Sequence, residues 1–163
     1  MDLTIPKLWT LGENIKSILE NMPDEYGSEE RMFNNITHGF TTPDENAADK
    51  LPLACVLPPE NGTFKSENGL SVDNVKLSLP VYAYFHIPDP ADAILTMYRF
   101  LQLLAMAIQD MNFSWFDRTI NVIPGEFAIG DVLKYSAGKE MTLKPPFYGV
   151  YVMLDVRIDD SAL

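Results

Sequence analysis

With 163 residues, the chain has the length of one domain, and its 47% hydrophobic content is enough to fill a single core. Its 23 acidic and 12 basic residues give a net charge of −11, and no run of Lys and Arg occurs, which disfavours a nucleic-acid site built on phosphate neutralisation. We therefore expect one α/β domain over residues 1–163 that does not bind DNA tightly.

The single cysteine indicates a protein that folds in a reducing compartment. Cys55 lies in the apolar run LPLACVLPP, where a buried, inert thiol is favoured over a catalytic nucleophile because neither histidine has a sequence link to it. The first residues, MDLTIPKLW, lack the basic start and apolar core of a secretion signal. We expect folding in the cytoplasm.

The first predicted element is an amphipathic helix that ends at Pro23. Apolar residues recur at steps of three and four, which places them on one stripe: Leu8, Leu11, Ile15, Ile18, Leu19 and Met22. Residues 24–50 are polar and show no clear period, which predicts a loop that is disordered or held by a partner. Within this loop, one short amphipathic turn is expected from Met32, Phe33, Ile36 and Phe40.

Two strands follow, and the second has the clearest pattern in the chain. The first covers Leu53 to Leu57 and precedes PPENGT, where Asn61-Gly62 suits a tight turn. In the second, alternate residues between Leu77 and Ile87 form an apolar core face. The opposite face carries Tyr82, Tyr84 and His86, which we expect to form a contact surface.

A helix over residues 91–111 begins directly after this strand. Asp89 suits the N-cap, Pro90 the first helical position, and Asp92 places a second carboxylate at the positive end of the helix dipole. A membrane span is disfavoured because Arg99 and Gln102 lie in the middle of the apolar segment.

This helix is apolar around more of its circumference than one sheet requires. Two interpretations of the excess surface remain open: a central helix covered on both sides by its own fold, or a helix that meets another subunit. Met97, Leu101 and Leu104 are the candidate interface residues. Trp115 and Phe116 follow the helix. We expect these aromatic side chains either to cover the end of the core or to anchor an interface.

The C-terminal third predicts a hairpin and a closing strand. Residues 120–123 and 127–133 suit two strands joined at Pro124-Gly125. The closing strand alternates from Tyr148 to Ile158, with an apolar face and a face that carries Asp155, Arg157 and Asp159. We interpret this charged row as a solvated ion ladder in preference to a metal or acid/base site.

Motifs that would indicate an enzyme are missing from the sequence. The segment SAGKEMT contains Gly-Lys, but Leu133 and Glu140 stand where a phosphate-binding loop needs Gly and Ser or Thr. His38 and His86 lack the spacing of a zinc site. We expect no catalytic residue, no metal and no cofactor.

The predicted elements combine into an α+β fold with a mixed, mostly antiparallel sheet packed against a long central helix and an N-terminal helix. In this order they resemble the tail terminator (tail completion) proteins of long-tailed bacteriophages. The resemblance rests on the leading amphipathic helix, on the strand-to-helix join PVYAYFHIPDPADAILTMYRFLQLLAMAI, and on the ending FYGVYVMLDVRIDD. No functional residue of that family can be matched individually.

The resemblance implies a structural virion protein of the tail or neck. Such proteins form homo-oligomeric rings, usually of six copies, that cap the tail tube and join it to the neck connector while DNA passes through the lumen. An acidic lumen would let DNA slide without binding, and Asp155, Asp159 and Asp160 are candidates for lining it.

Two other classes stay open at this point. Another neck, connector or baseplate subunit would also be acidic and would also form rings. A small cytoplasmic enzyme or ligand-binding α/β domain would need a pocket with convergent polar groups.

Overall fold

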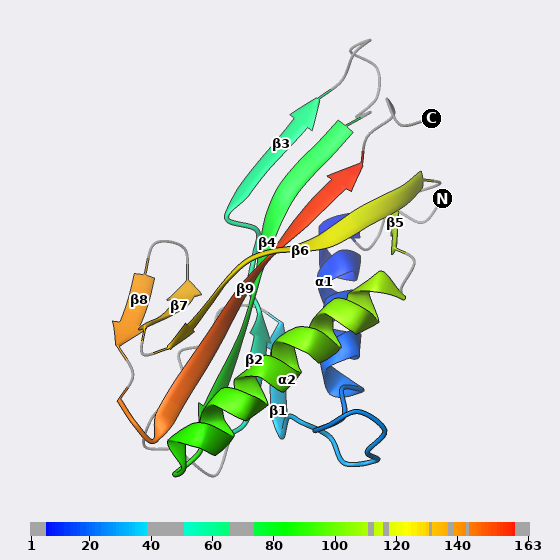
Figure 1. Cartoon of the computed structure of the whole chain (residues 1–163). Helices are drawn as coiled ribbons and strands as arrows, with labels where there is room; N and C mark the ends of the chain where they lie inside the picture. The colour runs from blue at the N-terminus through cyan, green and yellow to red at the C-terminus, as the bar shows by residue number, and fades with distance from the viewer. Residues whose placement is uncertain are drawn as a thin grey trace.

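In the part of the chain that it describes, the computed structural model has two helices on one face of a mixed, mostly antiparallel sheet, which confirms the predicted α+β class (Figure 1). It describes residues 6–38, 51–65, 74–110, 113–115, 118–130, 132–136, 139–142 and 144–158. The helices are α1 (Lys7–Glu20) and α2 (Pro90–Gln109).

Two long antiparallel strands, β4 and β9, form the centre of the sheet, whose order is β1-β2-β4-β9-β6-β5 with β3 also paired to β4. Among the strand pairs of the described residues, only β1–β2 is parallel. A separate hairpin consists of β7 and β8. The strands are β1 (Asn35–His38), β2 (Leu53–Val56), β3 (Asn61–Lys65), β4 (Asn74–His86), β5 (Phe113–Trp115), β6 (Arg118–Gly130), β7 (Val132–Ser136), β8 (Lys139–Thr142) and β9 (Phe147–Ile158).

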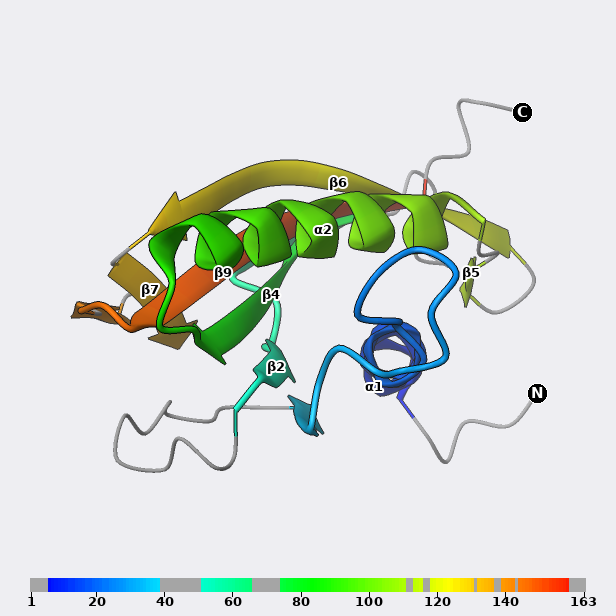
Figure 2. The same cartoon turned by 60° about the horizontal axis from the view of Figure 1, so that its bottom comes forward.

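The two helices divide one face of the sheet between them. α1 contacts β1 and β2, whereas α2 contacts β6 and β9. Figure 2 shows α1 end-on beside the long axis of α2, with the segment after α1 arching between them. The main core lies under both helices, where the alternate apolar residues of β4 and β9 meet the buried stripes of α1 and α2.

The start of α2 follows the sequence prediction closely. The Asp89 carboxylate accepts a hydrogen bond of 2.9 Å from the Ala91 backbone N–H, and Pro90 occupies the first turn. The cap satisfies one of the backbone donors that a helix start leaves without a partner. This fixes the corner between β4 and α2 and therefore the direction in which α2 crosses the sheet.

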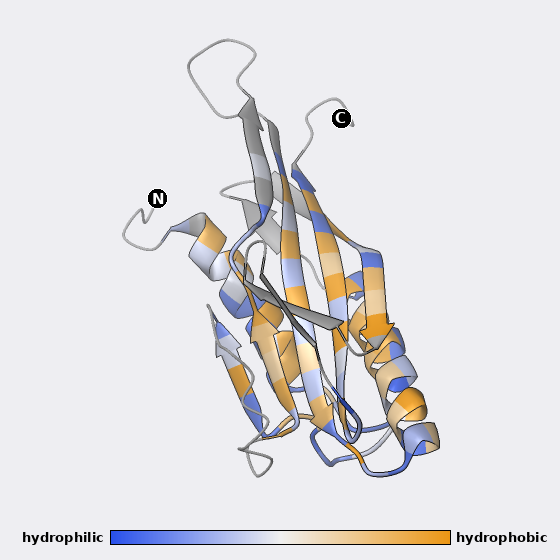
Figure 3. Ribbon diagram, turned by 90° about the vertical axis from the view of Figure 1, so that its left-hand side faces the viewer, coloured by the Kyte–Doolittle hydropathy of each residue, from blue (hydrophilic) through white to orange (hydrophobic). Residues whose placement is uncertain are grey.

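The opposite face of the sheet is also buried around its centre. Leu51, Leu53, Cys55 and Leu57 pack there against Tyr82, Tyr84 and Tyr151 in a second apolar cluster. The β7–β8 hairpin lies on this side, away from the helices, and β7 contacts β4 and β9 (Figure 1). Figure 3 shows apolar and polar bands alternating along the strands. Because the face opposite the helices is buried around its centre, its polar residues do not show that the whole face is exposed to solvent.

The prediction that residues 24–50 form one loop without regular structure is wrong over the first part of that range. Met32 and Phe33 are buried in the main core, and Ile36 lies in β1. They contribute to an ordered turn and an edge strand because burial of the two large apolar side chains stabilises the segment. Phe40 and the remainder of the predicted loop, residues 39–50, lie outside the described residues.

Two predicted turns lie inside strands. Asn61 and Gly62 begin β3, where they pair with Ser78 and Leu77 of β4. The Pro124-Gly125 step does not close a hairpin, since β6 runs past it and pairs with β9 on both sides of a register shift. Proline suits such a bulge near a sheet edge, where its missing N–H breaks no ladder bond.

Candidate assembly surface

Most of the aromatic face of β4 is buried inside the fold. Tyr82 and Tyr84 are fully buried, so the prediction that these two side chains meet a partner is wrong. The alternation on β4 predicted correctly which residues share a face. It did not predict that the face opposite the helices is buried, in a second apolar cluster. His86 is exposed at the end of the strand, where its ring meets Phe147 edge-on at 5.0 Å between centroids.

The buried tyrosines belong to a polar row that crosses four strands. Thr37, Cys55, Tyr82 and Tyr151 are successive partners on β1, β2, β4 and β9. The Thr37 hydroxyl donates to the Cys55 Sγ at 3.0 Å, and the Tyr151 hydroxyl donates to Glu60 Oε1 at 3.4 Å. Each phenol thus sits in a mostly apolar layer with local polar contacts.

Burial keeps these phenols neutral. Desolvation is the main cause that raises the pKa of Tyr82 far above its usual value, and Cys55 adds to it. Desolvation followed by Glu60 raises the pKa of Tyr151 to about 12. Neither hydroxyl can act as a base near neutral pH, so the row is suited to packing and orientation of the strands.

One stripe of side chains on α2 is buried in the core. Met97 and Leu104 are 2% and 1% exposed and pack on the sheet together with Ala93, Phe100 and Ile108. The interface interpretation is therefore wrong for Met97 and Leu104. Leu101 is half-buried at the border of this stripe.

The remainder of α2 is apolar and exposed. The helix is long and apolar enough to span a membrane, yet only 28% of its most apolar 18-residue stretch is buried inside the fold. Ile94 and Tyr98 are 45% and 59% exposed. Together with Leu101 they are spaced by four and three residues and so form a single stripe. The excess apolar surface predicted from the sequence is thus present and is not covered by the described residues.

This stripe points toward the β6 side of the sheet. The other flank of α2, which carries Leu103 and Ala107, faces α1. Since α1 lies over β1 and β2 while α2 lies over β6 and β9, the flank opposite α1 is turned toward β6. Figure 2 shows β6 running along one side of α2, with α1 on the other side.

The β6 strand brings a second exposed apolar group to the same place. Phe127 pairs with Val152, which belongs to the core under the helices, so Phe127 lies on the helix-covered face of the sheet. Its side chain is nevertheless 61% exposed. Within the described ranges, β5 pairs with β6 only as far as Ile120, and residues 121–130 have a partner strand on one side only.

We call Ile94, Tyr98, Leu101, Phe127 and the open edge of β6 the α2–β6 surface. An open strand edge offers backbone hydrogen bonds, and the adjoining apolar side chains offer area that association can bury. A strand added to β6 would lie beside the exposed flank of α2. The geometry is therefore suited to binding another polypeptide.

The other residues predicted for function are separate from this surface or cannot be placed. Asp155 lies on the opposite face of the sheet, where it pairs with Ser78 and Ile123. The side chain of Trp115 and the whole of Phe116, Asp159 and Asp160 lie outside the described residues. The predicted acidic lumen thus rests on Asp155 alone within the described part of the chain.

The described ranges contain no group of three or more His, Cys, Asp or Glu side chains that could hold a metal ion. Comparison with protein-family models and with curated proteins gave no match. Among the described residues, the α2–β6 surface is the feature that bears most directly on function.

Sequence reasoning missed Phe127 and the edge position of β6. Pro124 could have indicated that β6 lies near the edge of the sheet, because proline inside a strand marks an edge or a bulge. Once β6 is placed at an edge, the exposed side chain of Phe127 becomes a natural candidate for a contact residue.

Proposed function

We propose that this chain is a structural virion protein, a tail terminator that forms a ring on the tail tube and joins it to the neck. The observation that carries the proposal is the α2–β6 surface, where exposed apolar side chains adjoin an open strand edge. A surface of this kind supports assembly by strand addition better than it supports catalysis.

The position of the surface suits ring formation. β6 is at one side of the sheet, whereas β1 and β3 are at the other. If β6 of one copy meets the opposite side of the next copy, the contact is head-to-tail, and head-to-tail contacts close into rings when the rotation permits. The large negative charge supports a role in which DNA passes through without being held.

The experiment is assembly of the purified chain, alone and with the tail tube protein of the same phage. Native mass measurement and negative-stain images should show rings, or a cap of this protein on tube ends. Ile94→Asp and Phe127→Asp should abolish assembly while circular dichroism stays unchanged, because both side chains are exposed in the single copy.

Met106→Asp is the matched control, since Met106 is an exposed residue of α2 on a different flank. It should leave rings intact. A chain that stays monomeric at high concentration and in the presence of tube protein would contradict the proposal. Rings that bind the connector but not the tube would instead indicate another neck subunit.

A further inference from the structure

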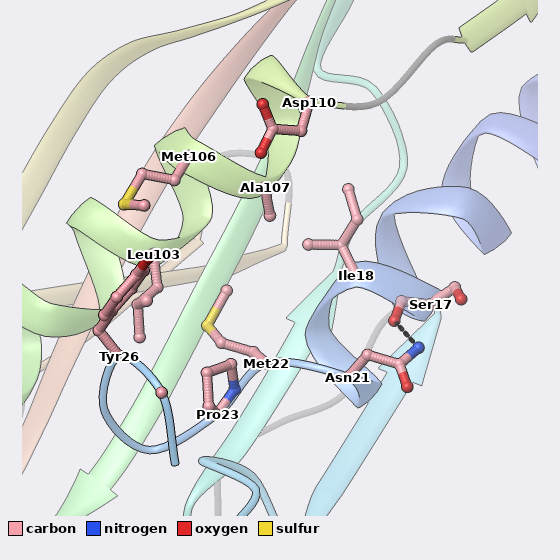
Figure 4. A pocket seen from close by; sticks show the side chains of 11 residues that line it. Ser17, Ile18, Asn21, Met22, Pro23, Tyr26, Leu103, Met106, Ala107 and Asp110 are labelled. Atoms are coloured by element: carbon pink, nitrogen blue, oxygen red, sulfur yellow. Dashed lines mark hydrogen bonds between the residues drawn. The ribbon is translucent and has the colours of Figure 1, made fainter. Parts of the chain in front are cut away.

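A cavity of about 420 Å³ lies between the last turns of α1 and α2, on the opposite flank of α2 from the α2–β6 surface (Figure 4). Its walls are mainly apolar, and its volume is within the range of ligand pockets. The apolar lining comes from Ile18, Met22, Pro23, Leu103, Met106 and Ala107.

The cavity opens into a groove along α2. A second hollow of about 270 Å³ shares Tyr26, Leu103 and Met106 with the first and adds Glu25, Arg99 and Gln102. Tyr26 is 82% exposed and stands between the two hollows. We call the two hollows together the α1–α2 groove. Its lining changes along α2 from mainly apolar in the first hollow to more polar in the second.

The loop that carries Tyr26 is tied in place. Backbone hydrogen bonds join Asp24 to Glu30 at 2.9 Å and Met32 to Met22 at 3.0 Å. Gly27 has a φ of 82°, a conformation that favours glycine. Arg99 of α2 meets Glu25 at 3.5 Å. The groove is therefore preformed, which lowers the entropic cost of binding.

The charge around the groove is negative. Asp110 caps the C-terminal end of α2, where the helix dipole is negative, and the last turn carries no basic residue. The described residues place no cation within ion-pairing distance of Asp110. The end of α1 differs, because Arg31 donates to the Asn21 carbonyl there at 3.0 Å. Glu25 is paired with Arg99, and the same loop carries three further carboxylates that do not line the groove: Asp24, Glu29 and Glu30.

We propose that the α1–α2 groove binds a basic, amphipathic segment of a partner protein. An apolar side chain of that segment fills the cavity against Met22 and Met106, and a Lys or Arg beside it faces Asp110 and the end of α2. A second copy of this chain is a poor occupant, since its net charge is −11 and it has no basic run. The site is separate from the α2–β6 surface and does not depend on ring formation.

The test uses the full chain labelled with ¹³C on the methionine methyl groups. Met22 and Met106 line the cavity, whereas Met97 is in the core and Met153 is on the opposite face of the sheet. The probe is a synthetic helical peptide with Leu on one face and Lys on the other. One control peptide replaces each Lys by Glu, and a second replaces each Leu by Ser.

The Lys–Leu peptide should shift the methyl signals of Met22 and Met106, and both control peptides should bind far more weakly. Met106→Gln should weaken binding about tenfold, as loss of an anchor contact does. Leu95→Gln, which changes an exposed residue of the same helix outside the groove, should bind as the wild type does. Asp110→Asn should weaken binding about threefold at low salt.

Three results would overturn the proposal: equal binding of the Glu–Leu peptide, shifts confined to other methionines, or no effect of Met106→Gln. A small uncharged probe, N-phenyl-1-naphthylamine, is titrated in parallel. If it binds as tightly as the Lys–Leu peptide and displaces it, the cavity is a small-ligand site and the peptide proposal is wrong.

Discussion

At the scale of single residues, the contact between Gly12 and His38 anchors the edge strand β1 to α1. The His38 ring stacks on Trp9 at 4.1 Å between centroids, and its Nδ1 lies 2.8 Å from Glu13 Oε1. A Cβ on Gly12 would collide with the imidazole ring. Glycine in a helix interior costs about 1 kcal/mol relative to alanine, so its place here is explained by the room it leaves for His38.

Gly12→Ala should therefore lower the free energy of unfolding although alanine is the better helix former. Overpacking costs about 1–3 kcal/mol, which exceeds the gain of about 1 kcal/mol in helix propensity. Urea unfolding measures the difference. In a His38→Ala background the same change should be stabilising, because the collision is gone. The same sign in both backgrounds would contradict the packing argument.

The buried phenols predict a loss of stability at alkaline pH. The pKa of Tyr151 is about 12 in the folded chain and near 10 in the unfolded chain, so the folded state holds more protons between these values. The free energy of unfolding is unaffected by this group below pH 10 and falls as pH rises from 10 toward about 12.

Tyr151→Phe should make that fall shallower, as measured by urea unfolding at several pH values across this window. Tyr26→Phe is the matched control, since Tyr26 is 82% exposed. A parallel decline in the wild type and in Tyr151→Phe would show that alkaline unfolding has another cause.

At the scale of elements, α2 has two stripes with different roles. Met97→Asp places a carboxylate in the core without a partner, which should cost about 3 to 5 kcal/mol. Ile94→Asp changes an exposed residue and should cost less than about 1 kcal/mol. Thermal unfolding of the two variants checks this, with Met97→Leu as a control of similar volume. Equal losses would place both stripes in the core.

The elements that the sequence predicted well are those whose signals are local. The N-cap Asp89 and the following Pro90 define the start of α2, and alternation defines β4 and β9. Each of these patterns is fixed by contacts within a few residues or by one buried face. The fold class follows from them.

The features that sequence reasoning missed depend on distant parts of the chain. Tyr82 and Tyr84 are polar enough to suggest a solvated face, but the second layer buries them. Pro124-Gly125 is a common turn pair, yet pairing with β9 carries β6 through it as a bulge. Phe127 is exposed because of where β6 lies in the sheet. No local sequence pattern predicts the position of a strand in its sheet.

At the scale of the whole molecule, charge sets opposite salt dependences for the two proposed surfaces. Each copy carries −11, so copies repel one another over the screening length, which is about 30 Å at 0.01 M salt and about 8 Å at 0.15 M. Raising the salt across this range should strengthen ring assembly through the apolar α2–β6 surface. Sedimentation at both salt concentrations measures it.

Binding of the Lys–Leu peptide to the α1–α2 groove should weaken over the same range, because salt screens its attraction to Asp110 and the acidic loop. Ile94→Asp should remove assembly and spare peptide binding, whereas Met106→Gln should do the reverse. If both activities changed with salt in the same direction, or if either variant removed both, one surface would serve both purposes. The separation of the two flanks of α2 on opposite sides of its buried stripe predicts that they act independently.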